Sequence, residues 1–306
     1  MTEAVAAIDC GSNSTRLLIA TSEGPLRREM RITRLSEGVD ASGTLSAPAQ
    51  ARTYETLGSY REMMDDAGVD RALLVATSAV RDAANGADFL AEAARRTGAR
   101  ARLLRGEEEA ALSYAGALGD LPPSATPTMI VDVGGGSTEL AVELDGTLFS
   151  YSMQLGCVRV CERALGRGIV GAGSDHAARA MIHAELDRAW AAVPELGSVF
   201  GAVRLVGLAG TVATLAQLDA QLTRYDRAAV HHRVLTRNTV VAWRDTLARE
   251  GPEDRLRRPG MVPGREDVLA AGLYILDAVM GRLGVAELLS SENDILDGVA
   301  ALLLSG

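Results

Sequence analysis

The spacing of apolar and polar positions divides the first 120 residues into strands and helices. Short β-prone apolar runs predict three strands in succession, near 4–10, 14–21 and 26–35, and two more near 71–76 and 101–105. Apolar residues at helical spacing predict helices near 47–66, 86–97 and 107–118. Three strands followed by alternating helix and strand predict an α/β domain.

The second part of the chain repeats this order. Strands are predicted near 128–133, 137–144, 147–154, 203–207 and 285–290, and helices near 157–165, 174–192, 237–249 and 265–283, with another helix from about 211 and a last one after the final strand. Pro122, Pro123 and Pro127 mark the connection between the halves. The sequence therefore predicts two domains, 1–121 and 122–306, and allows the last helix to pack back on the first domain.

Each half contains one copy of the same hairpin-like stretch. The first copy reads "AAIDCGSNSTRLLIA" and the second "MIVDVGGGSTELAVE". Either stretch alone has the features of an ordinary β-hairpin with a polar tip. Because the second copy keeps Asp, Ser and Thr and not only the turn glycine, the repeat indicates a shared chemical role and two related halves. The matched pairs are Asp9 with Asp132, Gly11 with Gly134, Ser14 with Ser137, and Thr15 with Thr138.

The composition excludes several phosphate-binding and nucleic-acid-binding classes. The 306 residues carry a formal net charge of −9, which argues against a general nucleic-acid surface. All basic residues are arginine, so the chain has neither the lysine of a Walker A loop nor that of a pyridoxal Schiff base. The stretch "DVGGGSTE" lacks the GxGxxG spacing and leads into a strand, which argues against a dinucleotide fold.

The sequence carries no sign of export or membrane insertion. A basic region followed by a long apolar segment is missing at the N-terminus, and the apolar stretch "LAAGLYILDAVMG" is short and interrupted by Asp277. Cys10, Cys157 and Cys161 are an odd number and lack a neighbouring Cys or His cluster, so we interpret them as buried free thiols. These features predict a cytoplasmic protein.

Eight stretches in this order resemble the exopolyphosphatase and guanosine pentaphosphate phosphohydrolase family of the actin-like ATPase superfamily. The resemblance covers nearly the whole chain and implies two ribonuclease-H-like domains with a phosphate-binding cleft between them. The stretches are "AIDCGSNSTRLLI", "RLSEGVDASGTL", "ATSAVRDAAN", "GEEEAALSYAG", "VDVGGGSTEL", "LGCVRVCE", "GLAGTVATLA" and "REDVLAAGLYIL".

The glycine-containing stretches suit phosphate binding. Glycines let the backbone approach an anion, and N–H groups and hydroxyls donate to phosphate oxygens. A third candidate is the turn into the helix near 211, because helix N-termini bind phosphate. The alternatives are plain turns, with Thr211 as a helix cap. The candidates are Gly11, Ser12, Asn13, Ser14, Gly134, Gly135, Gly136, Ser137, Thr138, Gly210 and Thr211.

Three carboxylates are candidate metal ligands. Asp9 and Asp132 end apolar strands, where burial of a lone carboxylate is unfavourable without a divalent cation or hydrogen-bond donors. Glu139 stands where the first copy has Arg16. The resemblance implies that Asp132 and Glu139 lie at a site for Mg²⁺, or Mn²⁺. The alternative for Glu139 is a solvated strand residue.

Two residues are candidates for catalysis. The resemblance assigns charge stabilisation to Arg81, which follows a strand and otherwise reads as a surface arginine. Water attack on a phosphoanhydride needs an orienting carboxylate. The family pattern G-x-E-E-A places this base at Glu109, with Glu108 as second choice and Glu107 as a residue that favours the helix dipole.

The resemblance implies an exopolyphosphatase that removes the terminal phosphate of linear polyphosphate, with short chains expected because a helical third domain of longer members is not present in this sequence. Hydrolysis of guanosine pentaphosphate and non-catalytic sensing of polyphosphate or guanosine tetraphosphate are the alternatives. A homodimer that extends the groove is a further expectation. Leu296 in "DILDG" replaces a family arginine, so the contacts of that arginine are expected to be missing. His231 and His232 receive no role.

Overall fold

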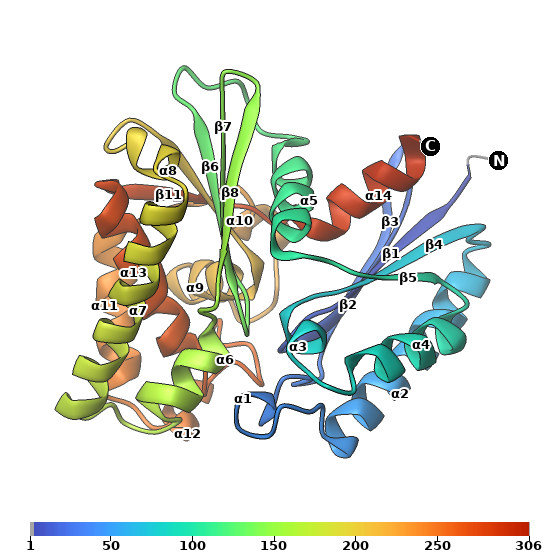
Figure 1. Ribbon diagram of the computed structural model, residues 1–306, viewed down its shortest axis with the longest axis horizontal. Helices are drawn as coiled ribbons and strands as arrows, with labels where there is room; N and C mark the ends of the chain where they lie inside the picture. Colours follow the sequence, from blue (N-terminus) through green and yellow to red (C-terminus); the bar gives the residue numbers. More distant parts are fainter. Residues whose placement is uncertain (1–2, 306) are drawn as a thin grey trace. The chain divides into compact units, whose positions relative to one another are not determined.

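The computed structural model describes residues 3–305 (Figure 1). The chain divides into two compact units: unit 1 comprises Met1–Gly119 with Asn293–Gly306, and unit 2 comprises Asp120–Glu292. The sequence placed the boundary two residues later and assigned 122–306 to the second domain. In the structure the last helix belongs to unit 1, the arrangement that the sequence allowed as an alternative.

Unit 1 is built on a five-stranded mixed sheet with the order β3-β2-β1-β4-β5. The first three strands are antiparallel neighbours, and β4 and β5 run parallel to β1. This is the predicted order of three strands followed by alternating helix and strand. The strands are β1 (Val5–Cys10), β2 (Ser14–Thr21), β3 (Gly24–Ile32), β4 (Arg71–Ala76) and β5 (Arg100–Leu103).

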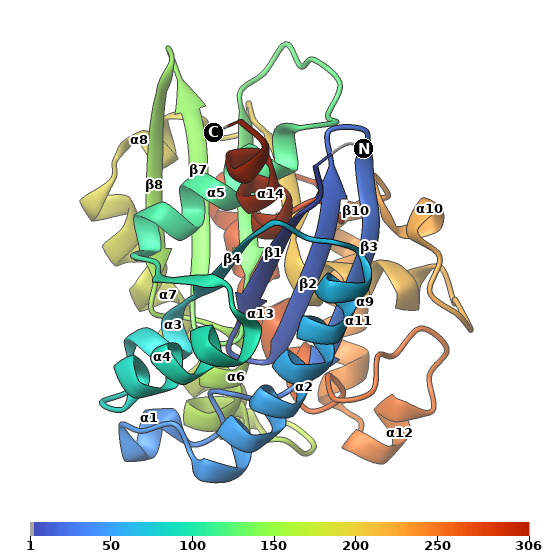
Figure 2. The same cartoon turned by 90° about the vertical axis from the view of Figure 1, so that its right-hand side faces the viewer.

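Helices cover both faces of this sheet (Figures 1 and 2). Alternate residues of β1 face opposite sides, so Ile8 packs with Leu57 and Phe89 beneath α2 and α4. Val5 and Ala7 face the other way and pack with residues of α14. Asp9 follows the same alternation and lies on the α14 side. The helices are α1 (Val39–Ser42), α2 (Ala47–Asp66), α3 (Ser78–Arg81), α4 (Gly86–Thr97), α5 (Gly106–Leu118) and α14 (Ile295–Ser305).

Unit 2 repeats this plan and extends it. Its six-stranded sheet has the order β10-β11-β9-β6-β7-β8, in which β6, β7 and β8 form the antiparallel part and β9 lies parallel to β6. The predicted α/β fold class is therefore present in both units. The strands are β6 (Thr128–Val133), β7 (Thr138–Leu144), β8 (Thr147–Met153), β9 (Arg204–Leu208), β10 (Val234–Thr236) and β11 (Glu287–Ser290).

The core of unit 2 joins one face of this sheet to surrounding helices. Met129 and Leu140 of the sheet pack with Leu186 and Ile275, which belong to the long helices α7 and α13. The helical elements are α6 (Cys157–Val160), a π-helical turn (Cys161–Leu165), α7 (Ala172–Ala192), α8 (Glu195–Ser198), α9 (Ala209–Asp219), α10 (Arg227–Val230), α11 (Arg237–Ala248), α12 (Pro252–Leu256) and α13 (Leu269–Leu283). Within residues 3–305 no helix has both the length and the apolar character needed to span a bilayer.

The structure corrects several local predictions. The short helices α1, α3, α8, α10 and α12 and the strand β10 were not predicted, because each is too short to show a periodic pattern. The predicted helix 157–165 splits into α6 and a π-helical turn. Cys10, Cys157 and Cys161 are free and buried, as expected.

Two glycines allow α5 and α14 to touch through their backbones. A Cβ at Gly116 would lie 1.9 Å from the carbonyl oxygen of Asp294, and one at Gly298 would lie 2.1 Å from that of Leu112. Both distances are far below any real Cβ contact, and backbone atoms cannot rotate away. The two glycines therefore determine how closely α14 approaches α5 within unit 1.

We expect Gly298→Ala to lower the free energy of unfolding by about 1–3 kcal/mol, because the added methyl group overpacks the crossing of α5 and α14. Thermal or urea unfolding measures this. The control is Gly173→Ala in α7, where a Cβ meets open space and the better helix propensity should stabilise by up to about 1 kcal/mol. Equal stability of the two variants would contradict the close crossing.

Candidate active site

The first glycine-containing hairpin, between β1 and β2, is held by its own backbone and by the segment after β3. The Gly11 N–H donates to the Ser14 carbonyl at 3.1 Å, and a Cβ on Gly11 would lie only 3.0 Å from that oxygen. The Ser12 carbonyl accepts from the Ser36 N–H at 2.9 Å, and the Ser12 hydroxyl lies 3.0 Å from that of Ser78. The loop is thus fixed while several side chains around it stay available.

Three buried polar atoms around this loop have no hydrogen-bond partner among the described residues. They are the Asn13 amide nitrogen, the Ser36 hydroxyl and the Asp9 Oδ1 atom. An unsatisfied buried polar group is unfavourable by about 1–3 kcal/mol, so three at one loop indicate a ligand site. The two donors suit an anion, and the carboxylate oxygen suits a cation. Ser36 was missed by the sequence reasoning, although it stands in "RLSEGVDASGTL".

Asp9 faces Arg16 across the β1–β2 ladder. The Arg16 Nε and Nη2 atoms donate to Asp9 Oδ2 at 3.0 and 2.7 Å. Burial raises the pKa of Asp9, and the contact with Arg16 opposes that rise. Arg16 keeps one oxygen of the carboxylate engaged, and the other, Oδ1, is the one that lacks a partner.

Arg81 and Glu109, the two catalytic candidates, are brought together in unit 1. The sequence predicts a loop at Arg81, but Ser78 to Arg81 form one helical turn after β4, so Arg81 is the last residue of α3. Its Nη1 atom donates to the Leu104 carbonyl at 2.8 Å and lies 3.3 Å from Glu109 Oε2. Since Ser78 at the start of α3 contacts Ser12, this helix links the phosphate loop to the catalytic pair.

The three glutamates at the start of α5 have different environments. Glu109 is 8% exposed and contacts Arg81. Glu108 accepts from the Arg105 N–H at 2.9 Å, closing the N-terminus of the helix, and Glu107 is exposed. The neighbour of Arg81 is therefore the residue that the sequence ranked first as base, and Glu108 acts as a cap.

The second hairpin, between β6 and β7, has the same backbone contact as the first. The Gly134 N–H donates to the Ser137 carbonyl at 3.0 Å. The start of α6 covers this loop, since the Cys157 and Val158 N–H groups donate to the carbonyls of Gly134 and Gly135, both at 2.9 Å. Because the Gly134 N–H already bonds to Ser137, the N–H groups of Gly135 and Gly136 are the donors of this glycine run that suit a phosphate.

Two predicted hydroxyl donors are used inside unit 2. The Thr138 hydroxyl donates to the Leu155 carbonyl, and the Thr211 hydroxyl donates to the Val133 carbonyl at 3.2 Å. The accepting carbonyls belong to the last residue of β6 and to the segment after β8. Ser137, 2% exposed, is the remaining hydroxyl of this loop. Thr138 and Thr211 therefore support the loop with their hydroxyls.

Asp132 and Glu139 are directly opposite each other on β6 and β7. They are 7% and 1% exposed, and the Ser152 hydroxyl donates to Glu139 Oε1 at 2.7 Å. Opposed residues of an antiparallel pair share one face, and like charges there are destabilising. Two buried carboxylates on one face supply the hard oxygen ligands that Mg²⁺ prefers. The alternative of a solvated Glu139 is excluded by its burial.

The third predicted phosphate site, at the start of α9, differs from the prediction. The helix begins at Ala209, so Thr211 lies inside its first turn and is not the cap. A Cβ on Gly210 would lie 1.8 Å from Arg265 Nη1, which shows that this guanidinium rests directly on the glycine. Sequence reasoning missed Arg265, which opens the stretch "REDVLAAGLYIL" and is 8% exposed.

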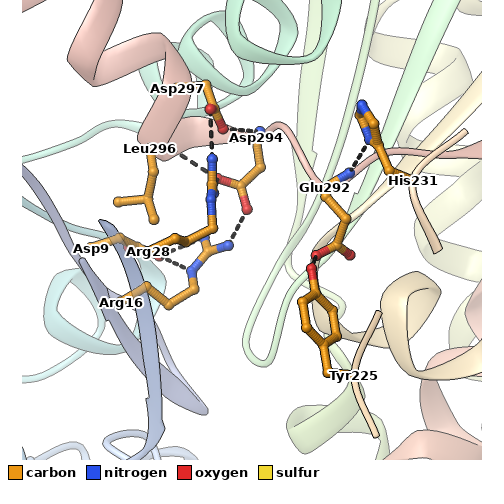
Figure 3. A network of polar contacts seen from close by, with 9 residues as sticks. All are labelled: Asp9, Arg16, Arg28, Tyr225, His231, Glu292, Asp294, Leu296 and Asp297. Carbon is orange, nitrogen blue, oxygen red and sulfur yellow. Dashed lines mark hydrogen bonds and ion pairs between the residues drawn. The ribbon is translucent and has the colours of Figure 1, made fainter. Parts of the chain in front are cut away.

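Leu296, which replaces a family arginine, lies in the core of unit 1. Leu296 is fully buried with the apolar residues of β1, and a cation does stand nearby: Arg28 Nη2 donates to Asp297 at 2.6 Å. A guanidinium thus reaches this segment from β3 (Figure 3), while the loss of the contacts of the family arginine stays a prediction.

His231 ties together the first and last residues of unit 2. Its Nδ1 atom accepts from the Glu292 N–H at 3.0 Å (Figure 3). Its Nε2 atom lies 2.7 Å from Asp120 Oδ2. Because an amide must donate, Nδ1 is the acceptor and Nε2 carries the proton. Asp120, His231 and His232 are close enough to share a metal, but the protonated Nε2 makes His231 a hydrogen-bond donor in this arrangement.

A family model and curated proteins match most of this chain. Residues 19–304 match the model of the Ppx/GppA phosphatase family. The chain is 38% identical to exopolyphosphatase 2 of Mycobacterium tuberculosis, covering 97% of both proteins. It is 28% identical to a guanosine-5'-triphosphate,3'-diphosphate pyrophosphatase of Aeromonas hydrophila, covering 96% of this chain and 58% of that protein.

Solved structures agree with the sequence comparison. An exopolyphosphatase-like protein superposes with a TM-score of 0.91 at 31% identity, covering 99% of both chains. The Ppx/GppA family member of Aquifex aeolicus superposes with a TM-score of 0.79 at 28% identity, covering 100% of this chain and 99% of that chain. The predicted resemblance and fold class are thereby confirmed.

Proposed function

Because the chain belongs to the Ppx/GppA phosphatase family, we propose that it is an exopolyphosphatase that releases the terminal phosphate of short linear polyphosphate. As a member it is a phosphoanhydride hydrolase. The observation that carries the proposal is the linkage within unit 1 of the phosphate loop, Arg81 and the buried Glu109. Linear polyphosphate is a chain of anionic phosphates joined by phosphoanhydride bonds. The phosphate loop and Arg81 suit the anionic groups, and Glu109 suits the activation of a water that attacks the bond.

Glu109 is assigned the role of general base. Its carboxylate accepts a proton from water, and the water oxygen forms a bond to the terminal phosphorus while the bridging P–O bond breaks. The products are orthophosphate and a chain shorter by one phosphate. Arg81, whose Nη1 atom lies 3.3 Å from Glu109 Oε2, holds this carboxylate by an ion pair and offers further N–H donors to the transferred phosphoryl oxygens.

The loops are assigned to binding. Asn13 in the first loop and Ser36 in the segment after β3 carry buried donors without a partner among the described residues, and N–H groups of the second loop supply further donors. In unit 1 the carboxylate of Asp9, whose Oδ1 atom lacks a hydrogen-bond partner among the described residues, suits Mg²⁺ or Mn²⁺ as a hard oxygen ligand. In unit 2 the facing carboxylates of Asp132 and Glu139 suit the same ions for the same reason. When bound, the ion would neutralise charge on phosphate oxygens.

Hydrolysis of guanosine pentaphosphate is the second candidate, favoured by the relative from Aeromonas hydrophila. It would use the same base and the same loops, because the bond that breaks is again a phosphoanhydride. Specificity between the two substrates would then depend on residues that contact the nucleoside or the rest of the chain. The expected homodimer remains a prediction that light scattering tests.

Phosphate release with Mg²⁺ distinguishes these functions. We expect release from tripolyphosphate, weaker release from long polyphosphate, and little from guanosine pentaphosphate. Release from the nucleotide alone would support the second candidate. Tight binding of all three without release would contradict hydrolysis and indicate a sensor of anionic phosphate chains.

A further inference from the structure

Asp294 is the N-terminal cap of α14, and it contacts more than the helix. Its Oδ1 atom accepts from the Leu296 N–H at 2.9 Å, the usual capping contact. Its Oδ2 atom forms an ion pair with Arg16 Nη1 (Figure 3). A cap requires only one oxygen, and asparagine or serine provides it equally well. The second oxygen therefore serves another purpose.

Arg16 is shared between two carboxylates. Its Nε and Nη2 atoms hold Asp9 Oδ2, and Nη1 holds Asp294 (Figure 3). A planar guanidinium that is held on two edges has a fixed orientation. Since both donors to Asp9 approach the same oxygen, the carboxylate is held with Oδ1 directed away from Arg16. This Oδ1 atom is buried and has no hydrogen-bond partner among the described residues.

The charges of this network do not balance. Among the described residues, the carboxylates of Asp9, Asp294 and Asp297 form ion pairs with two guanidinium groups, those of Arg16 and Arg28. Three carboxylates thus face two guanidinium groups in a region where every side chain is at most 24% exposed. Asp9 Oδ1 is the oxygen of this network that lacks a hydrogen-bond partner within residues 3–305.

We propose that Asp294 is a positioning residue for the hydrolysis, which it serves through Arg16. By taking one edge of the guanidinium, Asp294 prevents Arg16 from neutralising Asp9 fully and fixes its hold on Oδ2. Asp9 Oδ1 then stays directed away from Arg16 and open to contact a divalent cation. This inference deepens the proposed function and rests on it.

Two asparagine substitutions separate this role from general electrostatics. Asp294→Asn keeps the cap but removes the charge that shares Arg16. Asp297→Asn removes the same charge from the same network at a residue that pairs with Arg28 and, within residues 3–305, forms no ion pair with Arg16. Asp294→Ser, which also caps, is the second test variant if the asparagine variant is poorly folded. Thermal unfolding of each variant checks the fold.

Mn²⁺ binding to the substrate-free protein, measured by electron paramagnetic resonance, is the primary readout. We expect Asp294→Asn to weaken Mn²⁺ binding about tenfold, which corresponds to about 1.4 kcal/mol. Asp297→Asn should change the affinity for Mn²⁺ less than twofold. Tripolyphosphate hydrolysis by Asp294→Asn should need correspondingly more Mg²⁺. Equal Mn²⁺ affinities of the two variants, or no Mn²⁺ binding by the unchanged protein at millimolar concentration, would overturn the proposal.

The outcome is separable from the test of the proposed function. If the unchanged protein releases no phosphate from any substrate, but Asp294→Asn loses Mn²⁺ affinity and Asp297→Asn does not, the proposed function fails, and what stands is that Asp294 positions Asp9 for the cation. If the protein hydrolyses tripolyphosphate and both variants bind Mn²⁺ alike, the positioning role alone fails.

Discussion

Glu109→Gln is expected to lower kcat for phosphate release from tripolyphosphate by about 10²–10⁴-fold, the usual contribution of a general base. Glutamine keeps the size of the side chain and can still contact Arg81, but it cannot accept the proton of the attacking water. KM should change little, because the binding donors of Asn13 and Ser36 are untouched. Steady-state phosphate release against substrate concentration measures both constants.

The neighbouring glutamate provides a matched control. Glu107 lies in the same helical turn but is exposed, so Glu107→Gln removes an equal charge without altering the pair of Arg81 and Glu109. We expect its kcat to stay within about twofold, since the remaining effect is a dipole contact of about 0.3–1 kcal/mol on stability. A Glu109→Gln protein that keeps more than a tenth of the activity would place the base elsewhere.

Asp132→Asn is expected to have opposite effects on activity and stability. Loss of a cation ligand should reduce phosphate release about a hundredfold or more, because the ion contributes several kcal/mol of charge stabilisation. In the presence of EDTA the variant should be more stable by roughly 0.2–1 kcal/mol, since the like charges of Asp132 and Glu139 no longer face each other. Thermal unfolding with EDTA detects this as a rise in Tm.

Glu143→Gln is the control for this second experiment. Glu143 lies on the same strand, β7, and is exposed, so removal of its charge should affect neither phosphate release nor Tm noticeably. A fall in the Tm of Asp132→Asn with EDTA would show that Asp132 stabilises the folded protein without a cation. In that event the two carboxylates would be structural, and the assignment of the metal site would be wrong.

The register of the duplicated hairpins could be predicted from sequence because both copies keep their polar residues at equal spacing. In sequence, Asp9 aligns with Asp132 and Arg16 aligns with Glu139. In the structure, equivalent positions pair within each hairpin, with Asp9 opposite Arg16 and Asp132 opposite Glu139. Strand pairing has a period of two, so a hydrophobic pattern together with the turn fixes it.

Other parts of the site depend on contacts between distant segments. The helical turn that ends at Arg81 is too short to show a period, and its contact with Glu109 joins segments that no local pattern connects. Arg265 reaches Gly210 from 55 positions along the chain, and Asp294 reaches Arg16 from 278 positions. Such tertiary contacts follow from packing of whole elements, which a propensity argument does not describe.

The assignment of α14 to unit 1 has a consequence for synthesis on the ribosome. Unit 2 is one continuous segment, whereas unit 1 is interrupted by it and needs residues 293–305 to cover its sheet. Domains generally fold as they emerge, starting from the N-terminal end, but here the first sheet must wait with one apolar face exposed while the whole second unit is translated. On the nascent chain, Val5, Ala7 and Leu18 therefore lack the helix that covers them, and Arg16 lacks its second carboxylate, Asp294, until translation has passed residue 294.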